Sequence, residues 1–147
     1  MDLRGGARIL RIGAAAVALL GASQMLACGG GGGSSGPERR GVAFGSGVFV
    51  AVGERGGIFS STDATSWSQR EIPGFESALE AVAAGAGRFV AVGADGAILG
   101  SSDGIAWTQQ SSPTSATLFG VAFGQGLFVA VGSGGAILTS TDGVSFT

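Results

Sequence analysis

Hydrophobic residues in this chain come in short runs that are separated by glycine-containing turns. Near the end of the sequence the runs occupy residues 120–123, 127–131 and 136–140, and a fourth begins at residue 144. Runs of about four to six residues, rich in Val, Phe and Ile and bounded by turn residues, are typical of β-strands. A helix would need about ten or more residues with 3.6-residue periodicity, which this density of glycine prevents. The pattern therefore predicts meanders of short strands.

One such segment occurs three times. Residues 41–53 (GVAFGSGVFVAVG) return as residues 81–93 (AVAAGAGRFVAVG) and 120–132 (GVAFGQGLFVAVG), at spacings of 40 and 39 residues. A period of this length indicates a repeat architecture in which each unit buries its apolar surface against its neighbours. The Phe-Val-Ala-Val core of the segment does not alternate with polar residues, so both faces of its strand must be covered.

These observations predict an all-β fold, a partial β-propeller of about three four-stranded antiparallel blades of which the last is incomplete. The propeller is expected to occupy residues 37–147, with blades at about 41–80, 81–119 and 120–147.

A second repeated motif follows the third predicted strand of each unit. It reads STDATSW at residues 61–67, SSDGIAW at 101–107 and STDGVSF at 140–146. The three copies resemble the Asp-box (BNR-like) repeats of sialidase-like and photosystem II assembly factor-like propellers. The resemblance extends over residues 41–147 and implies the same propeller fold. The residues that carry it are Ser61, Asp63, Trp67, Ser101, Asp103, Trp107, Ser140, Asp142 and Phe146.

The box residues are expected to be structural. An aspartate in a turn accepts hydrogen bonds from backbone N–H groups, a serine hydroxyl does the same, and the aromatic residue buries apolar area between blades. The alternative is that Asp63, Asp103 and Asp142 bind Ca²⁺ or act in catalysis. A calcium site collects several oxygen ligands, whereas each box supplies one carboxylate, so neither a metal nor another cofactor is predicted.

Catalysis is not expected. The sialidase resemblance implies a tyrosine nucleophile and an arginine cluster, but the chain has no tyrosine and its arginines do not recur at matching repeat positions. Histidine, the commonest general base, is absent as well. The prediction is a non-enzymatic binding or assembly scaffold. The alternative is a glycan-binding or glycosidase-like protein whose catalytic groups lie on blades outside this sequence.

Binding is expected at one rim of the propeller. In a meander the turn between the second and third strands lies at the same end as the link between blades, and the boxes lie at the opposite end. The links 70–80 and 110–119 are the segments that differ most between repeats, and divergent loops on a regular scaffold are the best binding candidates. The candidate rim residues are Glu54, Arg55, Arg70, Glu71, Phe75 and Asp95, with Glu76 and Glu80 beside them.

The first 36 residues are predicted to direct and tether the protein. Three arginines precede an apolar run at residues 12–22, which has the length of a signal-peptide core and is too short to span a bilayer. Shortly after the run, the sequence Met-Leu-Ala precedes Cys28 and resembles the lipobox of bacterial lipoproteins. The resemblance implies a signal peptide at residues 1–27, a lipid on Cys28, and an extracytoplasmic, membrane-anchored protein in the periplasm or at the cell surface. Residues 28–36, rich in Gly and Ser, would serve as a flexible tether.

Charge and chain length restrict the partners. Residues 28–147 hold five Arg, nine acidic residues and no Lys, so a nucleic acid partner is not expected. An unknown protein or glycan remains as a partner. Because an arc of three blades leaves apolar faces uncovered at its ends, the chain is expected to be a fragment of a longer protein. The alternative is that copies of the chain self-associate through these faces.

Overall fold

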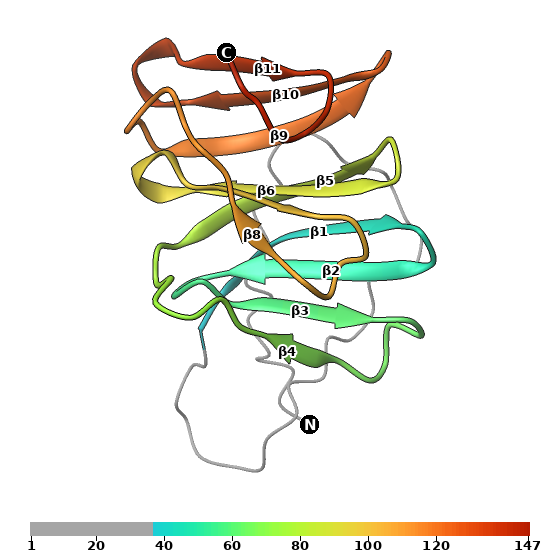
Figure 1. Ribbon diagram of the computed structural model, residues 1–147. Coiled ribbons are helices and arrows are strands. Elements are labelled where there is room, and N and C mark those ends of the chain that lie inside the picture. The colour runs from blue at the N-terminus through green and yellow to red at the C-terminus, as the bar shows by residue number, and fades with distance from the viewer. Residues whose placement is uncertain (1–36) are drawn as a thin grey trace, which may run out of the picture.

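The computed structural model describes residues 37–147, so the predicted signal peptide, Cys28 and the tether lie outside the described part (Figure 1). Three antiparallel sheets follow one another along the chain. The first sheet consists of β1 (Arg39–Gly45), β2 (Val48–Gly53), β3 (Ile58–Ser61) and β4 (Ser68–Arg70). The second consists of β5 (Leu79–Gly85), β6 (Arg88–Gly93), β7 (Ile98–Ser101) and β8 (Thr108–Gln109). The third consists of β9 (Leu118–Gly124), β10 (Leu127–Gly132) and β11 (Ile137–Ser140).

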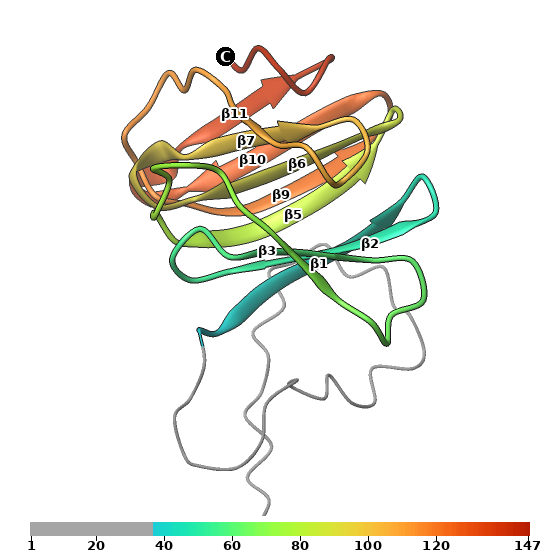
Figure 2. The same cartoon turned by 60° about the horizontal axis from the view of Figure 1, so that its bottom comes forward.

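The predicted all-β partial propeller is confirmed. Within each sheet the strands pair in sequence order, and β5 contacts β1 on one side and β9 on the other. The first strands of the sheets therefore lie side by side, and the sheets stack as successive blades (Figures 1 and 2). Two short 3₁₀ turns, η1 (Ala94–Gly96) and η2 (Ser133–Gly135), join the second and third strands of the later sheets. In the described part of the chain no helix has the length and apolar character needed to cross a membrane.

The first strand of each sheet begins two residues earlier than the repeated segment suggests. In the second sheet, for example, Leu79 pairs with Gly93 and Ala81 with Val92, so that Glu80 forms a bulge between the two pairs. The same irregularity occurs at the start of β1 and of β9. A bulge breaks the alternation of side chains, which is why the pattern of apolar residues did not reveal these positions as strand.

The predicted fourth strand of the third unit, at residues 144–147, is not present as a strand. Only Thr147 pairs with β11 there, through hydrogen bonds between its backbone and that of Thr139 (2.9 and 3.1 Å). The Asp-box turn takes up residues 141–145, and Thr147 pairs with Thr139 as Ser68, the first residue of β4, pairs with Ser60.

The hydrophobic core lies in two clusters, one at each junction between sheets. On β6, Phe89 and Ala91 pack toward the first sheet, whereas Val90 and Val92 pack toward the third. All four side chains have no solvent-exposed area. Both faces of this strand are therefore covered, which explains why its sequence is apolar without alternation.

Candidate functional site

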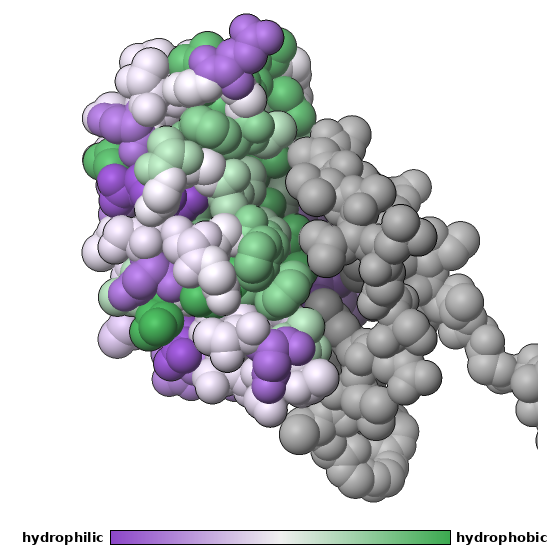
Figure 3. All heavy atoms as spheres, turned by 90° about the vertical axis from the view of Figure 1, so that its right-hand side faces the viewer, coloured by the Kyte–Doolittle hydropathy of each residue, from purple (hydrophilic) through white to green (hydrophobic). Residues whose placement is uncertain are grey.

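The turns of the three sheets gather at two opposite ends of the stack. The box end holds the three Asp boxes together with the hairpins between first and second strands. The link end holds the turns at residues 54–57, 94–97 and 133–136 together with the links 71–78 and 110–117. Figure 3 views the box end and shows a band of hydrophobic residues that runs along the stack from the third sheet to the first.

At the box end, each aspartate accepts hydrogen bonds from the turn that follows it. Oδ1 of Asp63 accepts from the backbone N–H groups of Thr65 (2.9 Å) and Ser66 (2.8 Å) and from the hydroxyl of Ser61 (2.9 Å). The Ser61 hydroxyl oxygen in turn accepts from the N–H of Ala64 (2.8 Å). The same four contacts recur in the second and third boxes, at Ser101 with Asp103 and at Ser140 with Asp142.

These donors stabilise the charged form of each carboxyl group. The backbone N–H groups of Ser145 and Val144, followed by the Ser140 hydroxyl, lower the pKa of Asp142 to about 2. The N–H groups of Ser66 and Thr65 lower the pKa of Asp63, and those of Ile105 and Ala106 lower that of Asp103. A carboxylate that stays ionised at neutral pH cannot donate a proton as a general acid. The carboxylates of the three boxes are therefore suited to stabilising the turns that follow them.

The aromatic residues of the three boxes differ in how deeply their side chains are buried. Trp107 is 8% exposed and its ring centroid lies 6.3 Å from that of Phe89, while Phe146 is buried in the core cluster between the second and third sheets. Trp67 is only half-buried, and its indole N–H donates to the carbonyl of Ala64 (3.2 Å). The difference arises because the boxes of the second and third sheets rest on the sheet before them.

The described residues contain no cluster of ligands that would support Ca²⁺ binding by the box aspartates. Across residues 37–147, no three side chains among His, Cys, Asp and Glu lie close enough together to hold a metal ion. Each box contributes one carboxylate, as its sequence suggested.

At the link end, the three turns share one backbone skeleton. In the first turn the N–H of Gly53 donates to the carbonyl of Gly57 (2.9 Å), and the N–H of Glu54 donates to the carbonyl of Glu38 (3.0 Å). Equivalent bonds join the second turn to Ala78 and the third to Thr117. The second residue of each turn has a left-handed backbone, with φ angles of 54° at Arg55, 56° at Asp95 and 66° at Gly134. The second position of the turn thus holds an arginine in the first sheet, an aspartate in the second and a glycine in the third.

Several candidate rim residues are engaged in holding the scaffold. Phe75 is half-buried and packs on the core between the first two sheets. Glu54 accepts a hydrogen bond from Arg40 (2.9 Å), and Arg40 also pairs with Glu80 across the junction. Arg70 donates from Nε to the Ser60 hydroxyl (2.8 Å).

The candidate rim residues that remain open to solvent are three charged side chains. These are Arg55, Glu71 and Asp95, and Glu76, which was named beside them, is exposed as well.

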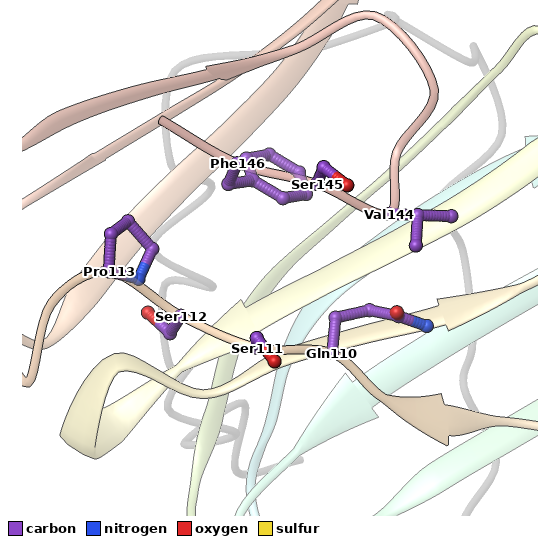
Figure 4. Close-up of a pocket in the computed structure, with 7 residues that line it drawn as sticks. All are labelled: Gln110, Ser111, Ser112, Pro113, Val144, Ser145 and Phe146. Atoms are coloured by element: carbon purple, nitrogen blue, oxygen red, sulfur yellow. The ribbon is translucent and has the colours of Figure 1, made fainter.

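A shallow cavity of about 360 Å³ lies between the second link and the tail of the third sheet (Figure 4). Gln110, Ser111, Ser112 and Pro113 line one side of it, and Val144, Ser145 and Phe146 line the other. The wall formed by Gln110 to Pro113 belongs to the link 110–119, which is a binding candidate because its sequence differs from that of the first link. Nothing in the sequence indicated that the third box would form the opposite wall, because that depends on how the link crosses between the sheets.

The polar groups of the link side of this cavity are fixed by local bonds. The Gln110 amide nitrogen donates to the Thr108 hydroxyl (3.0 Å), and the Ser112 hydroxyl donates to the carbonyl of Thr114 (2.9 Å). Ser111 and Ser145 are exposed. The cavity therefore combines an aromatic wall with hydroxyl groups, which suits a neutral, extended ligand better than a charged one.

Comparison with known proteins identifies similar propellers. A sequence profile described as the DUF6242 beta propeller domain matches residues 29–147. The structure of YCF48 from Cyanidioschyzon merolae is 22% identical over 74% of this chain, with a TM-score of 0.61. A structure of YCF48 bound to D1 peptide is 17% identical over 76% of this chain, with a TM-score of 0.65. The matches cover 36% and 39% of those chains, and at such identities the likeness shows a shared fold alone. No curated protein matches the sequence.

Proposed function

Because this chain belongs to the DUF6242 beta propeller domain family, we propose that it is a non-enzymatic scaffold that binds a segment of a partner protein at its link end. One observation carries the proposal: three turns with the same backbone hydrogen bonds place an arginine, an aspartate and a glycine at one exposed position, beside divergent links, one of which also lines the cavity. A constant framework with variable side chains is how repeat proteins build recognition surfaces. The structure of YCF48 bound to D1 peptide supports this, since a propeller of similar fold holds a peptide in that complex.

The non-catalytic role is supported by the state of the carboxylates. Those of the three boxes are ionised and occupied by local donors, and Glu54 and Glu80 are paired with Arg40. A glycosidase would need two carboxyl groups facing one substrate, one of them protonated.

Binding at the link end can be tested by selecting from a random peptide library displayed on phage against the full chain. We expect enriched peptides to bind the native chain and to lose roughly tenfold or more in affinity when Arg55→Glu and Asp95→Lys are combined, because both reversed charges border the binding surface. The readout is the dissociation constant of a selected synthetic peptide, measured by fluorescence anisotropy.

The matched control is the pair Ser46→Glu and Gln125→Lys. These exposed residues have the same left-handed backbone, with φ angles of 50° and 49°, but lie in hairpins at the box end. They should leave the affinity unchanged. Failure to enrich any peptide, or equal losses in the two double variants, would reject the link end as the binding surface.

We further propose that the scaffold is a bacterial lipoprotein, anchored through Cys28 on the extracytoplasmic side of a membrane. Support comes from the order of a charged start, a short apolar run, a lipobox-like sequence and a Gly/Ser tether. Cells that express the full chain should incorporate labelled palmitate into it, and Cys28→Ala should abolish the label because Cys28 is the only cysteine. A label that persists in Cys28→Ala would disprove the anchor.

A further inference from the structure

The two links between sheets begin in the same way. Arg70, at the end of the first sheet, pairs with Ile58. In the second sheet the N–H of Gln110 donates to the carbonyl of Ile98 (2.8 Å), and Ile98 occupies the place of Ile58 in its unit. Gln110 is therefore the counterpart of Arg70, and the residues that follow the two can be compared one by one.

The links also end in the same way, although the first is one residue longer. A Cβ on Gly56 of the first turn would meet the carbonyl oxygen of Phe75, and a Cβ on Gly96 of the second turn would meet that of Thr114. Because Gly56 and Gly96 hold the same place in their turns, Thr114 is the counterpart of Phe75.

The first link covers its junction with apolar side chains. Ile72 and Phe75 both pack on the core cluster between the first and second sheets. The same cluster contains Trp107 from the box of the second sheet. At this junction the link, the box and the two sheets therefore form one continuous apolar core.

The second link lacks this apolar cover. Its residues at the two equivalent positions are Ser112 and Thr114, and the box residue at this junction is Phe146, whose ring is smaller than an indole. The Ser112 hydroxyl donates to the carbonyl of Thr114 (2.9 Å), so it is turned toward its own link. None of residues 110–117 belongs to the core cluster between the second and third sheets.

The cavity of about 360 Å³ lies where the cover is missing. Ser111, Ser112 and Pro113 face Val144 and Phe146 across it (Figure 4). Of the link residues that line it, Ser112 is the one whose counterpart in the first link packs on the core. The cavity therefore lies at the position that an isoleucine side chain covers in the first junction.

A fourth strand does not close the equivalent site of the first junction. β8 follows Trp107 and pairs with β7 in the second sheet. Ile72 reaches the core cluster with that strand in place. The position of the cavity thus depends on the link and the box, and a fourth strand beside the third box is compatible with it.

From this comparison we infer that the cavity holds one branched aliphatic side chain (Ile, Leu or Val) of the partner segment, and this inference rests on the proposed function. Such a side chain restores the packing that Ile72 provides in the first junction, and the burial of its carbon atoms contributes affinity. None of the seven lining residues is charged, so a charged side chain would lose its hydration without gaining a counter-ion. Ser111 and Ser145 are exposed beside the cavity, and their hydroxyl groups can bond to the backbone of the segment.

The first test uses N-acetyl-isoleucinamide as a neutral probe, titrated into the ¹⁵N-labelled full chain and followed by NMR. The backbone N–H signals of Ser112 and Ser145 should shift, whereas those of Ile72 and Ala106, their counterparts at the filled junction, should not. N-acetyl-alaninamide should bind roughly tenfold more weakly or worse, because its side chain lacks three of the carbon atoms. The corresponding aspartate derivative, with a charged side chain, should cause no shift.

Two variants close the cavity by restoring residues of the first junction, Ser112→Ile from the link and Phe146→Trp from the box. Each should weaken binding of the probe by roughly tenfold or more, because its own side chain occupies the site. Ser115→Ile is the matched control, since it adds the same side chain to the same link at an exposed position outside the cavity. It should leave binding unchanged, and circular dichroism of all three variants should match the parent.

Failure of the inference can be told apart from failure of the proposed function. Peptides from the phage library should share an Ile, Leu or Val, and Ser112→Ile should weaken their binding as it weakens that of the probe. Library peptides that bind at the link end but tolerate Ser112→Ile would overturn the inference and leave the proposed function intact. A probe that shifts Ser112 and Ser145 while no peptide is enriched would support the cavity's preference and reject the proposed function. Equal shifts at both junctions, or none up to the solubility of the probe, also contradict the inference.

Discussion

Replacing Phe89 by alanine is expected to lower the free energy of unfolding by about 3–5 kcal/mol. The Phe89 side chain has no exposed area and fills the junction between the first and second sheets, among Val50, Val52 and Trp107. Removing the ring deletes buried apolar area and leaves a cavity that two rigid sheets cannot close. Equilibrium unfolding in urea, with the midpoint and the slope fitted together, measures the loss.

The repeat supplies the control for this substitution. Phe49 is the equivalent residue of the first sheet but lies on the face that no other sheet of residues 37–147 covers, and it is only half-buried. Phe49→Ala removes the same atoms from a partly solvated site, so it should cost only about 1–2 kcal/mol. Equal losses for Phe49→Ala and Phe89→Ala would show that the sheets do not cover one another as described.

The second large effect is expected for Gly93→Ala, which should cost about 3 kcal/mol, the upper part of the usual range for overpacking. The backbone of Gly93 is extended, so the requirement for glycine is one of space. A Cβ at this position would lie 2.0 Å from the carbonyl oxygen of Ala78 and 2.8 Å from Leu79 Cα. That carbonyl accepts a hydrogen bond from the N–H of Ala94 (2.9 Å), so it cannot move aside without loss of the bond.

Gly124→Ala is the control for the glycine substitution. Gly124 also ends a strand, but no atom lies within 4 Å of the position that a Cβ would take. The change should alter stability by less than about 0.5 kcal/mol in either direction. The midpoints of thermal unfolding of the two variants, monitored by circular dichroism, measure the difference in stability. A Gly93→Ala protein as stable as Gly124→Ala would mean that the link at Ala78 is not held against the turn.

The strands and their stacking could be predicted because each depends on a local pattern that occurs three times. Apolar runs bounded by glycine define the second and third strands, and the unbroken Phe-Val-Ala-Val core requires cover on both faces, which β6 receives. The bulges at Arg40, Glu80 and Phe119 were missed because a bulge breaks the alternation on which such predictions depend.

The candidate site was predicted only at the level of its elements. The link end and its charged turns followed from the order of strands in a meander. The engagement of Phe75 with the core and of Arg40 with Glu80 did not, because both are contacts between residues of different units. The cavity between Pro113 and Phe146 has the same origin, since its walls come from segments about thirty residues apart that meet only after the sheets stack.

By itself, the sequence determined that this protein is a glycine-punctuated β-repeat, where its turns and Asp boxes lie, and which residues are apolar on both faces of a strand. Those properties depend on backbone conformation and periodicity, which neighbouring residues set. Only the tertiary structure decided which copy of each repeated residue is buried. Val92 and Val131 occupy the same place in their units, yet one has no exposed area and the other is 45% exposed, because burial depends on whether another sheet lies on top.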